Sequence, residues 1–348
     1  MMAVTVVSLQ QLRASRWADV LIGVLLWLVF SALFLTGIGF RGSYGAQITG
    51  DEPFYLLATE SLLTDGDLDL RDEYAAASYT AYYDGPQPLW YQSVPNARGE
   101  LLAPHEPGLS WLVLPGFALS GLTGAKSSLA LVGALVVPLT YFLARRWARR
   151  RAALLGALAV GLSAPIYVYS TQLYPEVPAA VLVLGTLLLL TRRVGPSWGE
   201  AAAVALLLSG IMWLGIKYAG VVAVLGLYAL YRYRQAPQAL GVLSLLGLVS
   251  GGYYLWWHYH WFGGLTPYTV NVVYAQEETT LGILQAHIRI INRLYRLLGL
   301  WVDREFGVLR YAPVYVLGLP LLVAWGLTGR RGQATVRSPE GRRGQSGP

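Results

Sequence analysis

Residues 18–40 read ADVLIGVLLWLVFSALFLTGIGF, an apolar run broken by a single charged side chain. About 20 apolar residues in a helix span the hydrocarbon core of a bilayer. The run is longer than the h-region of a signal peptide, and no persuasive cleavage site follows it. This stretch therefore predicts a retained membrane anchor near the start of the sequence.

Similar apolar runs recur along the chain. Of its 348 residues 55% are hydrophobic and 13% are charged, whereas a soluble domain carries about 25% charged residues. We therefore expect an all-α polytopic membrane protein with about eight transmembrane helices. The predicted spans are residues 18–40, 125–144, 152–171, 177–191, 199–215, 218–231, 238–260 and 311–328.

Basic residues occur in short clusters between these runs. With eight spans every cluster falls on one side, together with both termini, and the positive-inside rule makes that side cytoplasmic. The clusters are Arg13 and Arg16, Arg145–Arg151, Arg192 and Arg193, Arg232 and Arg234, and Arg330 and Arg331. The net charge of +7 thus indicates topology in the cytoplasmic (cell) membrane and not a nucleic-acid partner.

Two long segments, residues 41–124 and 261–310, lie outside in this topology. The apolar stretch 108–122 is predicted to lie against the outer leaflet, because a ninth span would move Arg145–Arg151 outside. Residues 281–300 place apolar side chains and arginines on opposite faces of a helix, which predicts an interfacial helix. Residues 1–328 would form one membrane domain, followed by a disordered cytoplasmic tail, 329–348.

The first external segment begins with GDEPFY, residues 50–55. Two adjacent carboxylates, Asp51 and Glu52, are costly so near a bilayer unless they have partners or a function. Asp51 could simply cap a helix that runs to about Thr64, and that alternative stays open. Phe54 and Leu57 would turn an apolar face of this helix to the membrane surface.

An acidic run follows this helix. Asp65, Asp67 and Asp69 alternate and precede Asp72 and Glu73, as in a calcium loop with oxygen ligands. The position where an EF-hand needs glycine is a leucine, so a solvated acidic turn is the favoured interpretation. The chain has no cysteine, and its four histidines are too scattered for a metal-ligand motif.

Further ionisable groups fall at the same predicted outer rim. His105 and Glu106 end the first segment, Glu176 starts the fourth span, and Lys217 follows the fifth. Lys217 could instead extend to lipid headgroups, and the arginines of residues 281–300 could simply be solvated. An ion-coupled transporter would carry its ionisable groups near the midplane, so the pattern favours chemistry at the outer surface.

Five ordered segments carry a family resemblance. They are GDEPFYLLATESLLTDGDLDL (50–70), PHEPGLSWLVLP (104–115), LYPEVPA (173–179), WLGIKYAG (213–220) and LWVDREFGVLRYAPVY (300–315). From about residue 15 to 328 the chain resembles the C-type glycosyltransferase superfamily. It looks most like the bacterial family-39-like membrane enzymes, relatives of protein O-mannosyltransferases and lipid A aminoarabinose transferases.

This resemblance implies sugar transfer from a polyprenyl-phosphate-linked donor, outside the cytoplasmic membrane and with inversion. Asp51 resembles the catalytic acidic residue, with Glu52 beside it, and Glu176 matches a second acidic position. Lys217 resembles a cation near the donor phosphate. Further phosphate ligands are expected among Arg289, Arg293, Arg304 and Arg310, and substrate contacts at Tyr55, His105, Glu106 and Tyr174.

The expected chemistry needs a base for the acceptor proton and cations near the leaving phosphate. The expected partners are the lipid-linked donor, membrane lipids and a glycan, lipid or protein acceptor; the sugar stays open. No cofactor is required, but some members of the superfamily use a divalent metal, which Glu52, His105 and Glu106 could help bind. The alternatives are a transporter or lipid flippase, and a truncated, inactive relative that binds lipid-linked sugar.

Overall fold

The computed structural model describes residues 9–41, 45–192, 194–273, 290–305 and 307–311. They belong to two units, Met1–Thr280 and Leu281–Pro348. Within the described residues, regular structure is helical except for one isolated bridge between Ser93 and Asn271. The predicted all-α class agrees with this architecture.

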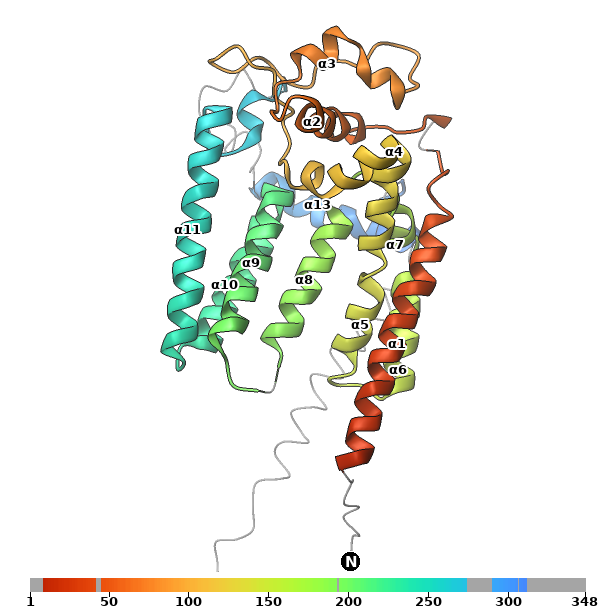
Figure 1. The fold of residues 1–348 in the computed structure, drawn as a ribbon, viewed down its shortest axis with the longest axis vertical. Coiled ribbons are helices and arrows are strands. Elements are labelled where there is room, and N and C mark those ends of the chain that lie inside the picture. The colour runs from red at the N-terminus through yellow and green to blue at the C-terminus, as the bar shows by residue number, and fades with distance from the viewer. Residues whose placement is uncertain (1–8, 42–44, 193, 274–289, 306, 312–348) are drawn as a thin grey trace, which may run out of the picture. The chain divides into compact units, whose positions relative to one another are not determined.

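The first unit contains a bundle of long helices (Figure 1). They are α1 (Leu9–Leu35), α4 (Gly108–Gly133), α5 (Val136–Ala144), α6 (Arg150–Gly161), α7 (Ala164–Tyr169), α8 (Glu176–Leu190), α9 (Trp198–Leu214), α10 (Ala219–Tyr233) and α11 (Pro237–Phe262). Three stretches are long and apolar enough to cross a membrane: Trp17–Leu35, Gly108–Ala144 and Pro237–Val270. These helices suggest membrane association, and the eight-span topology stays a prediction.

Two predicted spans each cover two helices: 125–144 falls on α4 and α5, and 152–171 falls on α6 and α7. The span 152–171 is two helices, because α6 ends at Gly161 and α7 starts afresh before Pro165. Proline has no N–H for the helical ladder and favours the first turn of a new helix. The last predicted span, 311–328, and the tail, 329–348, lie outside the described residues except for Tyr311.

The helices pack through small and aromatic side chains. Phe30 and Phe34 of α1 form one buried cluster with Ala134, Val137 and Tyr141. Alanine at such contacts lets helix backbones approach closely, as in membrane bundles. Large apolar side chains also cover the outside of the bundle: Leu21, Leu28, Leu155, Leu206, Leu227 and Leu248. An apolar exterior of this kind is typical of helices that face lipid.

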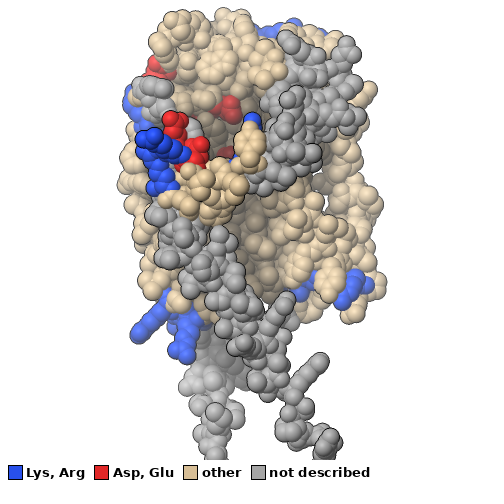
Figure 2. Space-filling view, turned by 180° about the vertical axis from the view of Figure 1, so that it is seen from behind, with Lys and Arg blue, Asp and Glu red and all other residues tan. Residues whose placement is uncertain are grey.

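Basic residues gather at one end of this bundle, the lower end in Figure 2. The carboxylate of Asp19 in α1 pairs there with Arg145 and Arg150, at 3.3 and 2.8 Å. The buried carboxylate of Glu200 in α9 pairs with Arg232 at 3.3 Å. Asp19 and Glu200 thus neutralise part of the positive charge at this end and join neighbouring helices.

Helix α4 contains a sharp elbow. Ser120 and Gly121 leave the helical region, and Gly121 adopts a φ of +56°. Side chains on Gly116 and Gly124 would overlap the facing backbone, so the two halves of α4 touch at this pair of glycines. The elbow separates the predicted surface stretch, 108–122, from the predicted span, 125–144.

A loop region covers one end of the bundle. It contains α2 (Glu52–Thr64), α3 (Arg71–Ala75) and the 3₁₀ turn η2 (Ser78–Ala81), and α2 lies between α3 and the first half of α4 (Figure 1). Every residue from Glu52 to Thr59 is buried. The prediction that α2 rests on the membrane surface is therefore wrong. Loop residues such as Leu70, Leu89 and Leu102 cover it instead.

The second unit contains α13 (Ile290–Val302) and α14 (Val308–Tyr311). The C-terminal part of the predicted interfacial helix, 281–300, is thus helical, whereas residues 281–289 lie outside the described residues. Tyr295, Leu298 and Val302 are exposed at spacings of three and four. This exposed apolar stripe agrees with the amphipathic pattern of the sequence.

Replacing Gly124 by alanine tests the elbow of α4. The new Cβ would overlap the carbonyl oxygen of Gly116, and overpacking of this kind costs about 1–3 kcal/mol. Gly156 in α6 is the matched control, because a Cβ there meets nothing within 4 Å. We expect the thermal unfolding midpoint in detergent to fall for Gly124→Ala but not for Gly156→Ala. Equal midpoints would contradict the close contact.

Candidate functional site

Two of the sequence motifs, GDEPFY and LYPEVPA, are joined by the carboxylate of Glu52. One carboxylate oxygen accepts a hydrogen bond from the N–H of Thr49 at 2.9 Å, and the other accepts from the N–H of Leu173 at 2.8 Å. The Tyr174 hydroxyl donates to the carbonyl oxygen of Thr49 at 3.2 Å. Gly50, with a φ of +60°, leaves room for this tyrosine ring, whose hydroxyl a Cβ would approach to 2.6 Å.

Glu52 is itself only 2% exposed. Burial raises the pKa of its carboxyl, while the two backbone N–H groups act in the opposite direction. Both oxygens are occupied by backbone, and the side chain does not line the cavity described next. The geometry therefore gives Glu52, predicted as catalytic, the role of positioning the Asp51 and Glu176 segments.

A cavity of about 230 Å³ opens beside this junction. Its walls come from α2, the segment before α4, the turn after α9, and the 3₁₀ turns η3 (Ile216–Tyr218) and η4 (Pro267–Val270). The lining residues are Asp51, Tyr55, Gln92, Pro104, His105, Glu106, Leu214, Gly215, Ile216, Lys217, Pro267, Tyr268 and Asn271.

Asp51 stands on one wall of the cavity, with a side chain 45% exposed. It occupies the N-cap position of α2, but its side chain makes no capping hydrogen bond. Its carboxylate instead accepts a hydrogen bond from the amide nitrogen of Gln92 at 2.8 Å. The capping alternative is therefore not realised, and the carboxylate is directed to the cavity.

His105 continues this chain of hydrogen bonds. Its Nε2 lies 2.7 Å from the amide oxygen of Gln92, so Nε2 carries the proton and donates. The imidazole stacks on the ring of Tyr55 with centroids 4.6 Å apart. Burial lowers the pKa of His105 to about 4, with Lys217 acting in the same direction and Asp51 against it. His105 is therefore neutral at neutral pH.

Lys217 also lines the cavity. Its ammonium lies 2.5 Å from a carboxylate oxygen of Glu176, the first residue of α8. Lys217 thus faces the cavity and a carboxylate. The second oxygen of Glu176 and the hydroxyl of Tyr218 are both buried without a hydrogen-bond partner. Glu176 reaches the cavity through Lys217 and does not line it.

Glu106 forms a buried network beneath the cavity. It accepts a hydrogen bond from the Tyr254 hydroxyl at 2.5 Å and lies 2.7 Å from Nε2 of His258. Nδ1 of His258 lies 2.7 Å from the carbonyl oxygen of Tyr254, so Nδ1 carries a proton. One further proton is therefore shared between His258 and Glu106. Burial raises the pKa of Glu106, with both partners acting against it.

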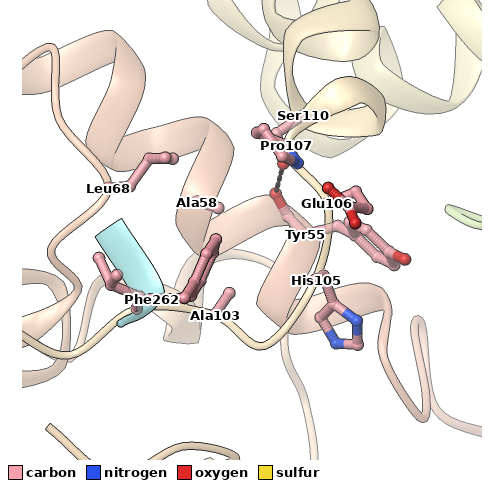
Figure 3. Close-up of a pocket in the computed structure, with 10 residues that line it drawn as sticks. Tyr55, Ala58, Leu68, Ala103, His105, Glu106, Pro107, Ser110 and Phe262 are labelled. Carbon is pink, nitrogen blue, oxygen red and sulfur yellow. Dashed lines mark hydrogen bonds between the residues drawn. The ribbon is translucent and has the colours of Figure 1, made fainter. Parts of the chain in front are cut away.

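Figure 3 shows how two segments bring the predicted substrate residues together. Tyr55 comes from α2, whereas His105 and Glu106 precede α4, and the Ser110 hydroxyl donates to the carbonyl oxygen of Tyr55 at 2.9 Å. These three predicted residues line the cavity. Tyr174 does not, because its hydroxyl is turned to Thr49 behind Asp51.

That four arginines of residues 289–310 bind the donor phosphate stays a prediction. Arg293 lies on α13, and Arg304 and Arg310 are exposed in the second unit, where Arg310 donates to the carbonyl oxygen of Arg304. Arg289 lies outside the described residues. The sequence missed Gln92, Tyr218, Tyr254, His258 and Tyr268. Of these, His258 carried a signal, since an ionisable residue inside a predicted span is expensive and usually functional.

Glu52, His105 and Glu106, which the sequence suggested as metal ligands, are not arranged to bind one shared ion. Both oxygens of Glu52 and both oxygens of Glu106 already accept or share protons, and His105 donates to Gln92. Within the part of the chain that the structure describes, the carboxylate cluster that could hold a cation is a different one, at Asp65, Asp72 and Glu73.

Comparison of the chain with protein-family models, with curated proteins and with solved structures gave no match.

Replacing Glu52 by alanine is expected to lower the free energy of unfolding by roughly 2–5 kcal/mol, because two buried N–H groups lose their acceptor. Glu52→Gln keeps one acceptor oxygen and should fall between alanine and the wild type. Chemical unfolding in detergent measures the differences. A loss below about 0.5 kcal/mol for Glu52→Ala would show that the bridge between Thr49 and Leu173 is unimportant.

The pKa of His105 predicts a pH dependence of stability. An unfolded histidine titrates near pH 6.5, so between pH 6.5 and 4 the unfolded chain binds more protons than the folded chain. Stability should therefore fall as the pH drops through this window, by up to about 3 kcal/mol. His105→Gln removes this contribution. Measured from pH 7.5 to 4, the unfolding free energy of the wild type should fall more steeply with decreasing pH than that of the variant, and parallel profiles would contradict the assignment.

Proposed function

We propose that this chain is a membrane glycosyltransferase that moves a sugar from a polyprenyl-phosphate-linked donor to an acceptor, with inversion. The observation that carries the proposal is that one cavity is lined by both Asp51, a carboxylate, and Lys217, an ammonium. An inverting transfer from a lipid phosphate needs such a pair, a base for the acceptor and a cation for the leaving group.

Asp51 is the proposed general base. Its carboxylate is half-exposed in the cavity, and the hydrogen bond from Gln92 fixes its orientation. The acceptor hydroxyl loses its proton to Asp51 while its oxygen attacks the anomeric carbon. The bond from that carbon to the phosphate oxygen breaks, and the polyprenyl phosphate leaves with the electron pair. Neutral His105 supports Gln92 and does not compete for the proton.

Lys217 is the proposed ligand of the donor phosphate. Its ion pair with Glu176 keeps a charged ammonium at the cavity wall when no phosphate is there. The Tyr218 hydroxyl, buried without a partner, is a further donor that a phosphate oxygen could satisfy. Glu176 is thus a positioning residue, and the arginines of residues 289–310 remain candidates for the same phosphate.

An apolar groove adjoins the cavity and suits a polyprenyl tail. It has a volume of about 310 Å³ and is lined by Gly108, Trp111, Leu112, Val132, Pro178, Val181, Leu182, Gly210, Trp213 and Leu214. Leu214 belongs to the walls of both the groove and the cavity. A donor could therefore hold its phosphate at Lys217 and its first isoprene units against the two tryptophans.

The proposed topology places this cavity outside the cell membrane. Of the basic clusters, Arg145–Arg151 and Arg232 with Arg234 belong to described segments at the other end of the bundle (Figure 1), which the positive-inside rule assigns to the cytoplasm. With eight spans both termini are cytoplasmic, and the sugar is transferred on the outer face.

A transporter or flippase is the alternative. Such a protein would carry ionisable groups along a central path. The sequence has no Asp or Glu from residue 107 to 175, from 177 to 199, or from 201 to 276. The carboxylates of the bundle therefore belong to its two ends, which favours the transferase.

Membranes that contain Asp51→Asn test the proposal, with sugar transfer from a radiolabelled lipid-linked donor as the readout. Loss of a general base is expected to lower the transfer rate by about 10²–10⁴-fold. Asp84→Asn is the matched control, because Asp84 lies in the same loop region but pairs with Arg41 at 2.7 Å. Lys217→Met should weaken donor binding as well as turnover.

Transfer at the wild-type rate by well-expressed Asp51→Asn would refute its role as base. Donor movement across proteoliposomes without a glycosylated product would favour the flippase. Donor binding without turnover in the wild type would identify an inactive relative.

A further inference from the structure

Three carboxylates converge at the end of α2 that is remote from Asp51. Asp65 is the C-cap residue of α2, and Asp72 and Glu73 lie in the first turn of α3. One oxygen of each carboxylate lies within 4.8 Å of the others. Like charges at this separation repel one another and need a compensating cation or proton.

Glu73 is the unusual member of this cluster. It is 4% exposed, and both of its carboxylate oxygens are buried without a hydrogen-bond partner. An unpaired buried carboxylate is among the most expensive groups that a folded protein can contain.

The basic side chains of this loop region form ion pairs with other carboxylates. Arg71, between Asp69 and Asp72 in the chain, pairs with Asp69 at 2.6 Å. Arg98 pairs with Glu100 at 2.8 Å. The ion pairs formed by residues of the described loop region do not include Asp65, Asp72 or Glu73, although Arg71 also acts electrostatically on Asp72.

We propose that Asp65, Asp72 and Glu73 bind a calcium ion. All ligand atoms are carboxylate oxygens, which hard cations prefer over the nitrogen and sulfur ligands of transition metals. Calcium takes about six to eight oxygen ligands in a flexible geometry, whereas magnesium demands a near-ideal octahedron and keeps several of its waters. Three carboxylates gathered in one place therefore suit calcium, and the exposed Asp65 and Asp72 leave room for water to complete the shell.

This site differs from an EF-hand. Asp67 and Asp69, which belong to the alternating pattern of the sequence, have other partners: Asp67 accepts from the Ser61 hydroxyl at 2.9 Å, and Asp69 binds Arg71. The turn between α2 and α3 brings Asp65 to residues seven and eight positions later. A bound cation would clamp α3 to the end of α2, the helix whose other end follows Asp51.

Calcium binding by the purified full-length protein in detergent tests this proposal. After chelation, equilibrium dialysis with radioactive calcium should give one ion per chain at millimolar calcium or below. The thermal unfolding midpoint should rise on addition of calcium and less on addition of magnesium, because a ligand of the folded state stabilises it. Neither measurement needs donor or transfer activity, so the result is independent of the proposed function.

The variants Glu73→Gln and Asp65→Asn should lose the bound calcium and the calcium-dependent rise in the midpoint. Asp84→Asn, an acidic residue of the same region outside the cluster, should keep both. The proposal is overturned if the wild type binds no calcium at millimolar concentration. It is equally overturned if Glu73→Gln binds calcium like the wild type, since the cluster then holds protons and the ion binds elsewhere.

Discussion

The arrangement of the loop region depends on one buried charge, the carboxylate of Glu52. A carboxylate removed from water must be hydrogen-bonded, and here it is satisfied by two backbone N–H groups separated by 124 positions in the chain, at Thr49 and Leu173. Neither segment can shift without leaving the charge or an N–H group unpaired. The bridge therefore fixes the distance between Asp51, on one side of Glu52, and the start of α8, where Glu176 holds Lys217.

The cavity beside this bridge is built from residues that hold one another in place. Gln92 links Asp51 to His105, Tyr55 stacks on His105, and Glu106 is anchored below by His258. Two opposite charges, Asp51 and Lys217, remain at the walls. Because each is oriented by a partner, the site is organised in advance, which is the condition under which electrostatic stabilisation of a reaction is most effective.

Hydropathy was enough to predict the helices of the bundle, because about 20 apolar residues in a row leave few alternatives to a buried or membrane helix. Sequence spacing could not predict contacts between residues of distant segments. The burial of α2 depends on loop residues up to 50 positions later, such as Leu102. The pairing of Glu106 with His258 spans 152 positions. The acidic run was predicted to be a solvated turn, and its spacing did not reveal that the α2–α3 turn brings Asp65, Asp72 and Glu73 together.

Leu214 is shared by the charged cavity and the apolar groove, so one side chain forms part of both compartments. A molecule with a polar head and an apolar tail would contact both compartments at once. A larger or smaller residue at position 214 would therefore change the selectivity for the head and the selectivity for the tail together. Selection for a new head would also change the preference for the tail.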